Sequence, residues 1–329
     1  MKNKFRNLFL AFGILAVIIM LFTFDVSYDE LLDNLRRAGF YLPLVLVLWL
    51  FIYLINTLSW YIILRSSGPV NSLSFARLYK FTVSGFALNY VTPVGLLGGE
   101  PYRIMELTSY VGVERATSSV ILYVMMHIFS HFCFWLSSVL IYVFFYPVGW
   151  GMGIVLGLIT LFCLLLVTLF IKGYRNGMAV ACVRLGSHIP FLKKRAVRFA
   201  ELHKEKLETI DSQIALLHQQ RKSTFYSALG LEYTARIVGC LEVWLILNVL
   251  TTDVSFVGCI LIVAFSSLLA NLLFFLPMQL GGREGGFALA VAGLSLSGAY
   301  GVFAALITRL REMVWIVIGL VLMKIGNRK

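Results

Sequence analysis

The sequence predicts an all-α polytopic membrane protein built on an inverted-topology repeat. Hydrophobic residues make up 60% of the 329 and charged residues 13%, whereas a typical soluble domain is roughly 25% charged. Several apolar runs reach the roughly 20 residues that a helix needs to cross a bilayer. Two similar Gly- and Pro-containing motifs, 93–100 and 277–284, recur in the two halves. We therefore expect a single integral membrane domain over 1–329.

The first half, 1–146, is predicted to start in the cytoplasm. Three basic residues precede an apolar run at 8–24, and an acidic loop separates that run from a second span at 40–64. The segment 71–113 contains the first motif and has basic residues on both sides. By the positive-inside rule this indicates a re-entrant element that enters and leaves on the cytoplasmic side. A third span at 116–145 completes the half.

The second half, 147–329, repeats this order from the opposite side of the membrane. Its predicted elements are spans at 151–171, 224–250 and 300–324 and a second broken element at 254–298. Neither flank of that broken element is basic, as an outward-opening re-entrant element requires. The prediction is six full spans plus two broken elements. Eight spans is the alternative, because a re-entrant pair and two full spans have the same hydropathy.

The segment 172–222 accounts for much of the net charge of +12. It holds 11 Lys and Arg residues against four acidic residues, a net charge of +7. A basic loop between spans indicates a cytoplasmic insertion, either an amphipathic helix on anionic headgroups or a helical hairpin that extends its flanking spans. The positive charge is therefore no sign of nucleic-acid binding.

The two motifs predict breaks in helices at membrane depth. The helix-breaking residues are Pro93, Gly98, Gly99, Pro277, Gly281 and Gly282. Proline stops the preceding helix, and glycine lets another backbone or a ligand approach closely. Broken backbone survives in a membrane only where it is buried in protein or lines a polar cavity. We expect a shared polar cavity near the midplane; the alternative is a pair of packing kinks.

Charged residues follow each motif directly. Each break is predicted to start a helix, whose free N–H groups favour an anion. Arg103 and Arg283 add guanidinium groups suited to phosphate, and Glu100 and Glu284 are predicted to set the local charge or couple protons. These four residues are the first candidates for a headgroup site.

Predicted spans five and six also contain ionisable residues. They are Glu232, Arg236, Glu242, Arg309, Arg311 and Glu312. Helical spacing predicts a Glu232–Arg236 pair and an Arg309–Glu312 pair. Such pairs either lock the bundle or form a charged path for a headgroup, with Arg309 as a ligand and Glu232 as a charge-setting residue.

His127 and His131 are four residues apart on span three. The zinc signature HExxH is not met, because residue 128 is Ile. We expect no metal, and hydrogen-bonded interior histidines with a protonatable relay as the alternative. The five cysteines have no paired spacing, and no nucleotide-binding or nucleophile motif is present, so we expect no cofactor and no enzyme activity.

The run from Asn89 to Arg103 and the run from Pro277 to Gly285 resemble the lysylphosphatidylglycerol synthase transmembrane-region family. This flippase-like domain forms the N-terminal membrane part of multiple peptide resistance factor, and the chain is similar to its stand-alone form. The resemblance implies re-entrant elements and movement of lipids, such as aminoacylated phosphatidylglycerol, between leaflets. Lys329 directly follows the sixth span, so we do not expect the lysyltransferase activity of the synthase domain.

The sequence thus predicts a lipid flippase in the bacterial inner membrane, with both termini cytoplasmic. An anionic or phosphate-bearing headgroup would cross through the cavity between the broken elements. The alternative is an accessory subunit or enzyme of lipid or lipid-linked glycan modification. Expected partners are membrane lipids and a separate lipid-modifying synthase, not nucleic acid, and homo-oligomerisation is left open.

Overall fold

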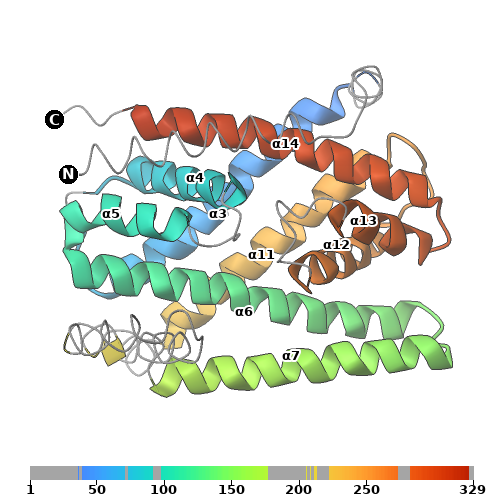
Figure 1. The fold of residues 1–329 in the computed structure, drawn as a ribbon, viewed down its shortest axis with the longest axis horizontal. Coiled ribbons are helices and arrows are strands. Elements are labelled where there is room, and N and C mark those ends of the chain that lie inside the picture. The colour runs from blue at the N-terminus through green and yellow to red at the C-terminus, as the bar shows by residue number, and fades with distance from the viewer. Residues whose placement is uncertain are drawn as a thin grey trace, which may run out of the picture.

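The computed structural model describes most of the chain. The described residues are 36, 39–70, 73–91, 98–176, 205, 208, 211–212, 222–272 and 282–325. Over these residues the regular structure is α-helical, with no strand (Figure 1). The predicted span at 8–24, most of the insertion 172–222 and the three helix-breaking residues Pro93, Pro277 and Gly281 lie outside the described residues.

Long and short helices alternate along the chain. The long helices are α3 (Tyr41–Ser66), α6 (Val113–Phe145), α7 (Trp150–Asn176), α11 (Lys222–Leu247) and α14 (Gly298–Lys324). The short helices are α4 (Phe75–Val91), α5 (Gly99–Val111), α12 (Phe256–Leu272) and α13 (Gly282–Ala292).

Three of the described helices are long and apolar enough to cross a bilayer. They are α3, α6 and the Trp150–Leu169 part of α7. The predicted class of helical membrane protein therefore fits the structure. Helices α11 and α14 have similar lengths, 26 and 27 residues, but they carry several charged residues, so the count of six spans stays a prediction.

Each predicted broken element contains two short helices that pack against each other. The first holds α4 and α5, and the second holds α12 and α13. Helices α4 and α12 have 17 residues each, so at 1.5 Å per residue they extend about 26 Å. That length is less than the roughly 30 Å hydrocarbon core. Short paired helices are what a re-entrant element requires.

The two halves have the same order of helix lengths and matching neighbours. Each half has a long helix, two short helices and a long helix: α3 to α6 in the first and α11 to α14 in the second (Figure 1). Helix α4 packs on α14, and its counterpart α12 packs on α6; α3 packs on its own counterpart, α11. The inverted repeat itself stays a prediction.

Close helix packing at α14 depends on glycine. A Cβ on Gly301 would lie 2.4 Å from the carbonyl oxygen of Phe287 on α13. A Cβ on Gly319 would lie 2.5 Å from the Cβ of Ala87 on α4. Small residues let membrane helices approach closely and gain dispersion contacts. These two glycines hold α14 against one short helix from each half.

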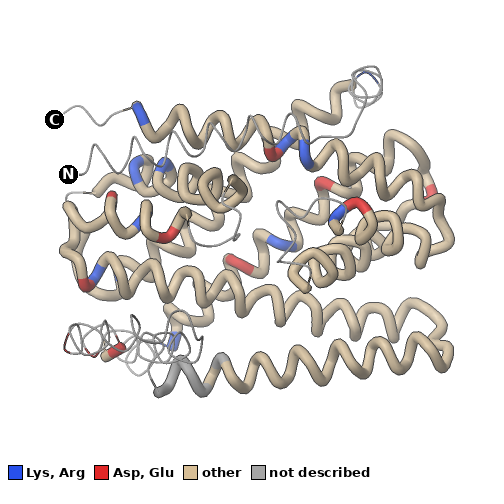
Figure 2. The backbone as a smooth tube through the Cα atoms, in the orientation of Figure 1, with Lys and Arg blue, Asp and Glu red and all other residues tan. Residues whose placement is uncertain are grey.

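Helix α7 packs against α6 and leaves most of its surface exposed. Trp150, Leu158 and Leu161 are 93%, 62% and 67% exposed. Figure 2 shows no charged residue along the part of this helix that it does not draw in grey. A continuous apolar surface of this kind suits contact with lipid.

The interior of the bundle is aromatic in part: Trp60 stacks on Tyr123 with ring centres 5.5 Å apart.

Candidate functional site: a charged cavity inside the bundle

A cavity of about 290 Å³ lies between seven of the described helices, α3, α4, α6, α11, α12, α13 and α14. Its lining is rich in ionisable side chains. Those among the described residues are His127, His131, Glu232, Arg236, Glu242, Arg283, Arg311 and Glu312. Figure 2 shows charged positions of α11, α13 and α14 within the bundle. Both halves of the chain therefore contribute to one polar interior site.

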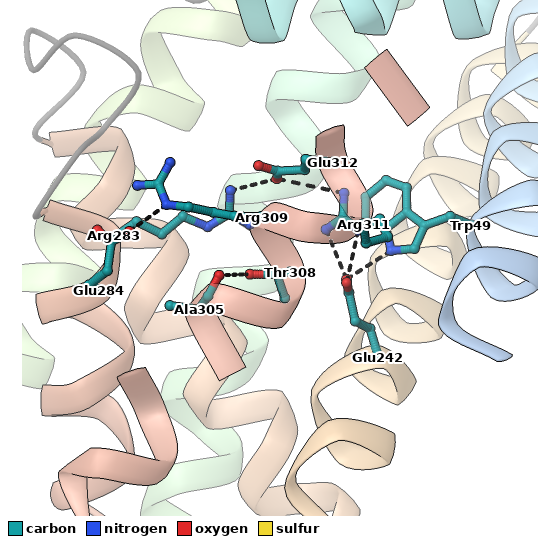
Figure 3. A network of polar contacts seen from close by, with 9 residues as sticks. All are labelled: Trp49, Glu242, Arg283, Glu284, Ala305, Thr308, Arg309, Arg311 and Glu312. Atoms are coloured by element: carbon teal, nitrogen blue, oxygen red, sulfur yellow. Dashed lines mark hydrogen bonds and ion pairs between the residues drawn. The ribbon is translucent and has the colours of Figure 1, made fainter. Parts of the chain in front are cut away.

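One wall of the cavity is a buried ion pair between α14 and α11 (Figure 3). The Nε and Nη2 of Arg311 donate to the two carboxylate oxygens of Glu242 at 2.9 and 3.0 Å. The indole Nε1 of Trp49 on α3 donates to the same carboxylate at 2.8 Å. The Arg311 guanidinium also lies 3.7 Å from the Trp49 ring centre. A bidentate pair of this kind fixes the guanidinium in both position and plane.

A second ion pair joins the start of α13 to α14. Arg283 donates from Nη1 to Glu312 at 2.5 Å, and Nη1 of Arg311 lies 3.6 Å from the same carboxylate oxygen. Arg309 pairs with Glu284 on α13 (Figure 3). The structure therefore gives Arg309 and Glu312 other partners than the intrahelical pair that their spacing predicted. The reason is that α13 packs along α14 and brings two further charges within reach.

The third polar group connects α6 to α11. His127 donates from Nδ1 to Glu232 at 2.8 Å. Arg236 donates from Nε to the hydroxyl of Ser130 at 2.7 Å and from Nη2 to the backbone oxygen of His127 at 2.5 Å. Glu232 and Arg236 do not form the predicted intrahelical ion pair in the described structure. Interhelical partners replace it, because α6 offers oxygen acceptors to Arg236 and the His127 ring as a donor to Glu232.

A second histidine, His131, follows His127 one turn further along α6. The rings of His127 and His131 are 5.6 Å apart and nearly perpendicular, and Trp135 lies 5.4 Å beyond His131. Among the described residues there is no group of three His, Cys, Asp or Glu side chains that could hold a metal. The arrangement is that of interior histidines, of which His127 has a carboxylate partner.

The first motif organises the α4–α5 junction. The backbone N–H of Gly99 donates to Oδ1 of Asn89 at 2.7 Å, and Nδ2 of Asn89 donates to Glu100 at 2.9 Å. Arg103 donates to Glu100 at 3.1 Å and to the backbone oxygen of Thr82 at 3.3 Å. The free N–H at the start of α5 is thus satisfied by a side chain, as a helix N-terminus requires.

Arg103 is fully enclosed by its own hairpin and by α6. It is 1% exposed, and its guanidinium lies 4.7 Å from the ring centre of Phe86 and 5.4 Å from that of Tyr123. Gly85 makes this approach feasible, because a Cβ there would lie 2.3 Å from Nε of Arg103. Arg103 therefore fastens α5 to α4.

Comparison with known proteins identifies the chain. It matches the family described as lysylphosphatidylglycerol synthase TM region over residues 8–320. The protein belongs to this family. A UPF0104 membrane protein of Methanothermobacter thermautotrophicus is 24% identical over 291 residues, which cover 86% of this chain and 82% of that protein. No solved structure matches significantly. Membership confirms the resemblance seen in the two motifs and establishes a membrane protein.

In this family member the predicted site residues are divided between the cavity and its surroundings. Arg283 and Glu232 line the cavity. Arg103, Arg309, Glu100 and Glu284 are outside the described lining, in ion pairs next to it. Gly98, Gly99 and Gly282 lie at the starts of α5 and α13. The functional roles of all these residues stay predictions.

Sequence reasoning singled out the Arg, Glu and His residues of the lining but missed others, among them Trp49, Asn56 and Asn271. Trp49 is an ordinary residue of an apolar helix, and nothing local marks it. Asn56 gave a usable signal, since it is an amide in the middle of a predicted span. Polar side chains inside a membrane segment usually face the protein interior.

A second cavity of about 280 Å³ lies between α6, α7, α12 and α13. Its lining is apolar, with Trp135, Leu156 and Phe265 among the residues. It is next to the charged cavity, because Trp135 donates its Nε1 to Ser267 on the charged-cavity wall at 3.0 Å. A polar space and an apolar space therefore lie side by side across α6 and α12.

Proposed function

We propose that this protein moves a phosphate-bearing lipid headgroup between leaflets through the charged cavity. The observation that carries the proposal is a cavity of about 290 Å³ that, among the described residues, is lined by three arginines and three glutamates inside a bundle of membrane helices. Ionisable groups are expensive at membrane depth and usually mark a path for a polar substrate. The volume is near the lower end of small-molecule sites. It suits a headgroup, with the acyl chains left in lipid.

Both broken elements contribute to the cavity, which supports a shared site. Tyr90 is in the last turn of α4, Asn271 is in the last turn of α12, and Arg283 is in the first turn of α13. The start of α13 combines free backbone N–H groups with a guanidinium, which is a favourable place for phosphate.

We assign Arg283 as the direct phosphate ligand. It lines the cavity and is 18% exposed at the side chain, whereas Arg103 and Arg309 are not among the described lining residues. In this proposal Arg103 positions α5 through its bond to the backbone oxygen of Thr82 on α4, and Arg309 positions α13 through Glu284. Glu232 sets the charge on the α6–α11 side.

Alternating access would follow from rocking of one repeat against the other. The matching helix order and matching neighbours of the two halves support an inverted repeat, the arrangement on which such transporters are built. We further propose an inner-membrane location with both termini cytoplasmic, and a separate synthase that supplies the lipid.

The test is a leaflet-resolved assay with purified protein in liposomes. Fluorescent lipids are bleached by a membrane-impermeant reductant, so accelerated loss of the protected inner-leaflet signal measures flipping. Arg283→Ala should lower the rate about tenfold or more, because a charged hydrogen bond contributes roughly 1.5–3 kcal/mol. Arg77→Ala is the matched control, since Arg77 is exposed on α4 and away from the cavity.

Equal rates for Arg283→Ala and wild type would reject Arg283 as the ligand. Absence of flipping by wild type with every lipid, under an imposed proton gradient as well, would reject transport by the protein alone. Chemical modification of a lipid in detergent micelles, where no leaflets exist, would instead support the enzyme alternative.

A further inference from the structure

Among the residues that the structure describes, the positively and negatively charged side chains that line the cavity are equal in number. Three are cationic and three are anionic: Arg236, Arg283, Arg311, Glu232, Glu242 and Glu312. The two segments 92–97 and 273–281, which join the short helices, have no charged residue in their sequence. A net anionic headgroup would leave an unbalanced charge in a low-dielectric interior, which is costly. A headgroup that carries one charge of each sign leaves the balance intact.

Both signs of charge occur in each part of the cavity, because Glu312 and Glu242 pair with Arg283 and Arg311 and because Arg236 follows Glu232 by one turn of α11. Arg283 and Arg311 lie on α13 and α14, and Glu232 lies on α11 beside His127 of α6. Along α11, Glu232 is ten residues from Glu242, the partner of Arg311, which corresponds to about 15 Å. We call the part around Arg283 and Arg311 the guanidinium end and the part around Glu232 the carboxylate end, and the two differ in the polar atoms that they leave without a partner.

Helix α3 runs antiparallel to α11 and places a further polar group at the carboxylate end. Trp49 bonds to Glu242, and Ser59 donates its hydroxyl to the backbone oxygen of Ala228 at 3.3 Å. Asn56 lies between those two contacts on α3, as Glu232 does on α11. The amide of Asn56 is thus level with the Glu232 carboxylate.

Among the described lining residues, four side chains have a buried polar atom without a hydrogen-bond partner, and the types of these atoms differ between the two ends. At the guanidinium end the atom is a donor, Nη1 of Arg311. At the carboxylate end the atoms are Oε1 of Glu232, Oδ1 of Asn56 and Nδ1 of His131. All three of these accept hydrogen bonds when His131 carries its proton on Nε2. Glu232 is 1% exposed and Asn56 is 4% exposed.

We propose that the cavity selects a zwitterionic phospholipid headgroup that carries a protonated primary amine, a proposal that rests on the proposed function. The phosphate binds at Arg283 and Arg311, and the ammonium donates to Glu232, Asn56 and His131. The N–H groups are required because the acceptors at the carboxylate end need donors. A quaternary ammonium has the same charge but no N–H.

The first experiment compares acyl-labelled lipids in the liposome assay. The set contains phosphatidylethanolamine, alanyl-phosphatidylglycerol, phosphatidylcholine and phosphatidylglycerol. The two amine lipids are net neutral and differ in headgroup length, so their order distinguishes an ethanolamine headgroup from an aminoacyl headgroup. We expect at least one of them to flip about tenfold faster than the other two lipids, the discrimination that one charged hydrogen bond provides.

The second experiment inverts the selectivity. Glu232→Gln removes the negative charge and leaves the lining net positive, so the rate ratio of amine lipid to phosphatidylglycerol should fall about tenfold. Asn56→Asp adds a negative charge at the same end and should raise that ratio. Glu114→Gln, the same chemical change at the start of α6 and outside the described lining, should leave the ratio unchanged. Opposite shifts in the first two variants are not produced by misfolding.

Binding in detergent separates this inference from the transport proposal. Short-chain forms of the same lipids are added to purified protein, and the thermal midpoint is measured, because a ligand of the folded state raises it. Larger stabilisation by amine lipids without flipping would keep the inference and reject transport. Flipping at equal rates for all lipids, or fastest for phosphatidylglycerol, would overturn the inference and leave transport standing. If the protein shows no flipping and no selective stabilisation, both the inference and the transport proposal are overturned.

Discussion

The ion pair between Arg311 and Glu242 permits a quantitative test of the cavity wall. The carboxylate accepts two hydrogen bonds from Arg311 and one from Trp49, at 2.8 to 3.0 Å. Glu242→Gln keeps the side-chain volume but removes the charge, so Arg311 stays buried at 1% exposure with an uncompensated guanidinium. Removing one partner of a buried pair costs roughly 3–5 kcal/mol.

We expect a loss near the lower limit, about 3 kcal/mol. Glu312, whose carboxylate oxygen is 3.6 Å from Nη1 of Arg311, still offers a second negative charge. Polar groups in membrane helices also find partners in the unfolded state, which reduces measured losses. Arg311→Met should cost a similar amount, because it leaves the Glu242 carboxylate buried with only the indole donor.

The double variant decides whether the two residues act as a pair. Glu242→Gln together with Arg311→Met leaves neither charge behind, so its loss should be smaller than the sum of the single losses by about 1–3 kcal/mol. The measurement is a titration with sodium dodecyl sulfate in mixed micelles, followed by circular dichroism. Glu114→Gln should stay within about 0.5 kcal/mol of wild type. Strict additivity of the two single losses would refute the pair.

Three further outcomes follow from the geometry. Gly99→Ala should lower the thermal unfolding midpoint by destabilising the α4–α5 hairpin, because its Cβ would lie 2.2 Å from the backbone oxygen of Gly85. Gly230→Ala, in open space on α11, should instead raise that midpoint through helix propensity. Gly239→Leu should abolish flipping while the protein stays folded, because Gly239 lines the cavity with nothing within 4 Å of its Cβ position; Gly230→Leu should flip normally in the same liposome assay. Trp49→Phe should cost about 1–2 kcal/mol in the micelle titration by removing one hydrogen bond to the buried carboxylate; an unchanged midpoint would contradict that bond.

The broken elements were predictable from local sequence, and the structure describes short paired helices there. Glycine and proline act on the backbone at their own positions, so their effect is readable without any neighbour. Hence α5 begins at Gly99 and α13 at Gly282, inside the predicted segments. The ion pair between Arg103 and Glu100 follows from their spacing on α5, but the contact of Arg103 with Tyr123 comes from the packing of α6 against the hairpin.

The sequence by itself determined the membrane class and the set of ionisable residues within apolar segments, while its division into two inverted halves stays a prediction. These depend on hydropathy, on charge around the spans and on local helix breakers. Only the tertiary structure decided which charges pair and which of them reach the cavity. Trp49 and Glu242 are 193 positions apart, and His127 and Glu232 are 105 apart. Such contacts depend on the register between packed helices, and helical spacing within one segment carries no information about that register.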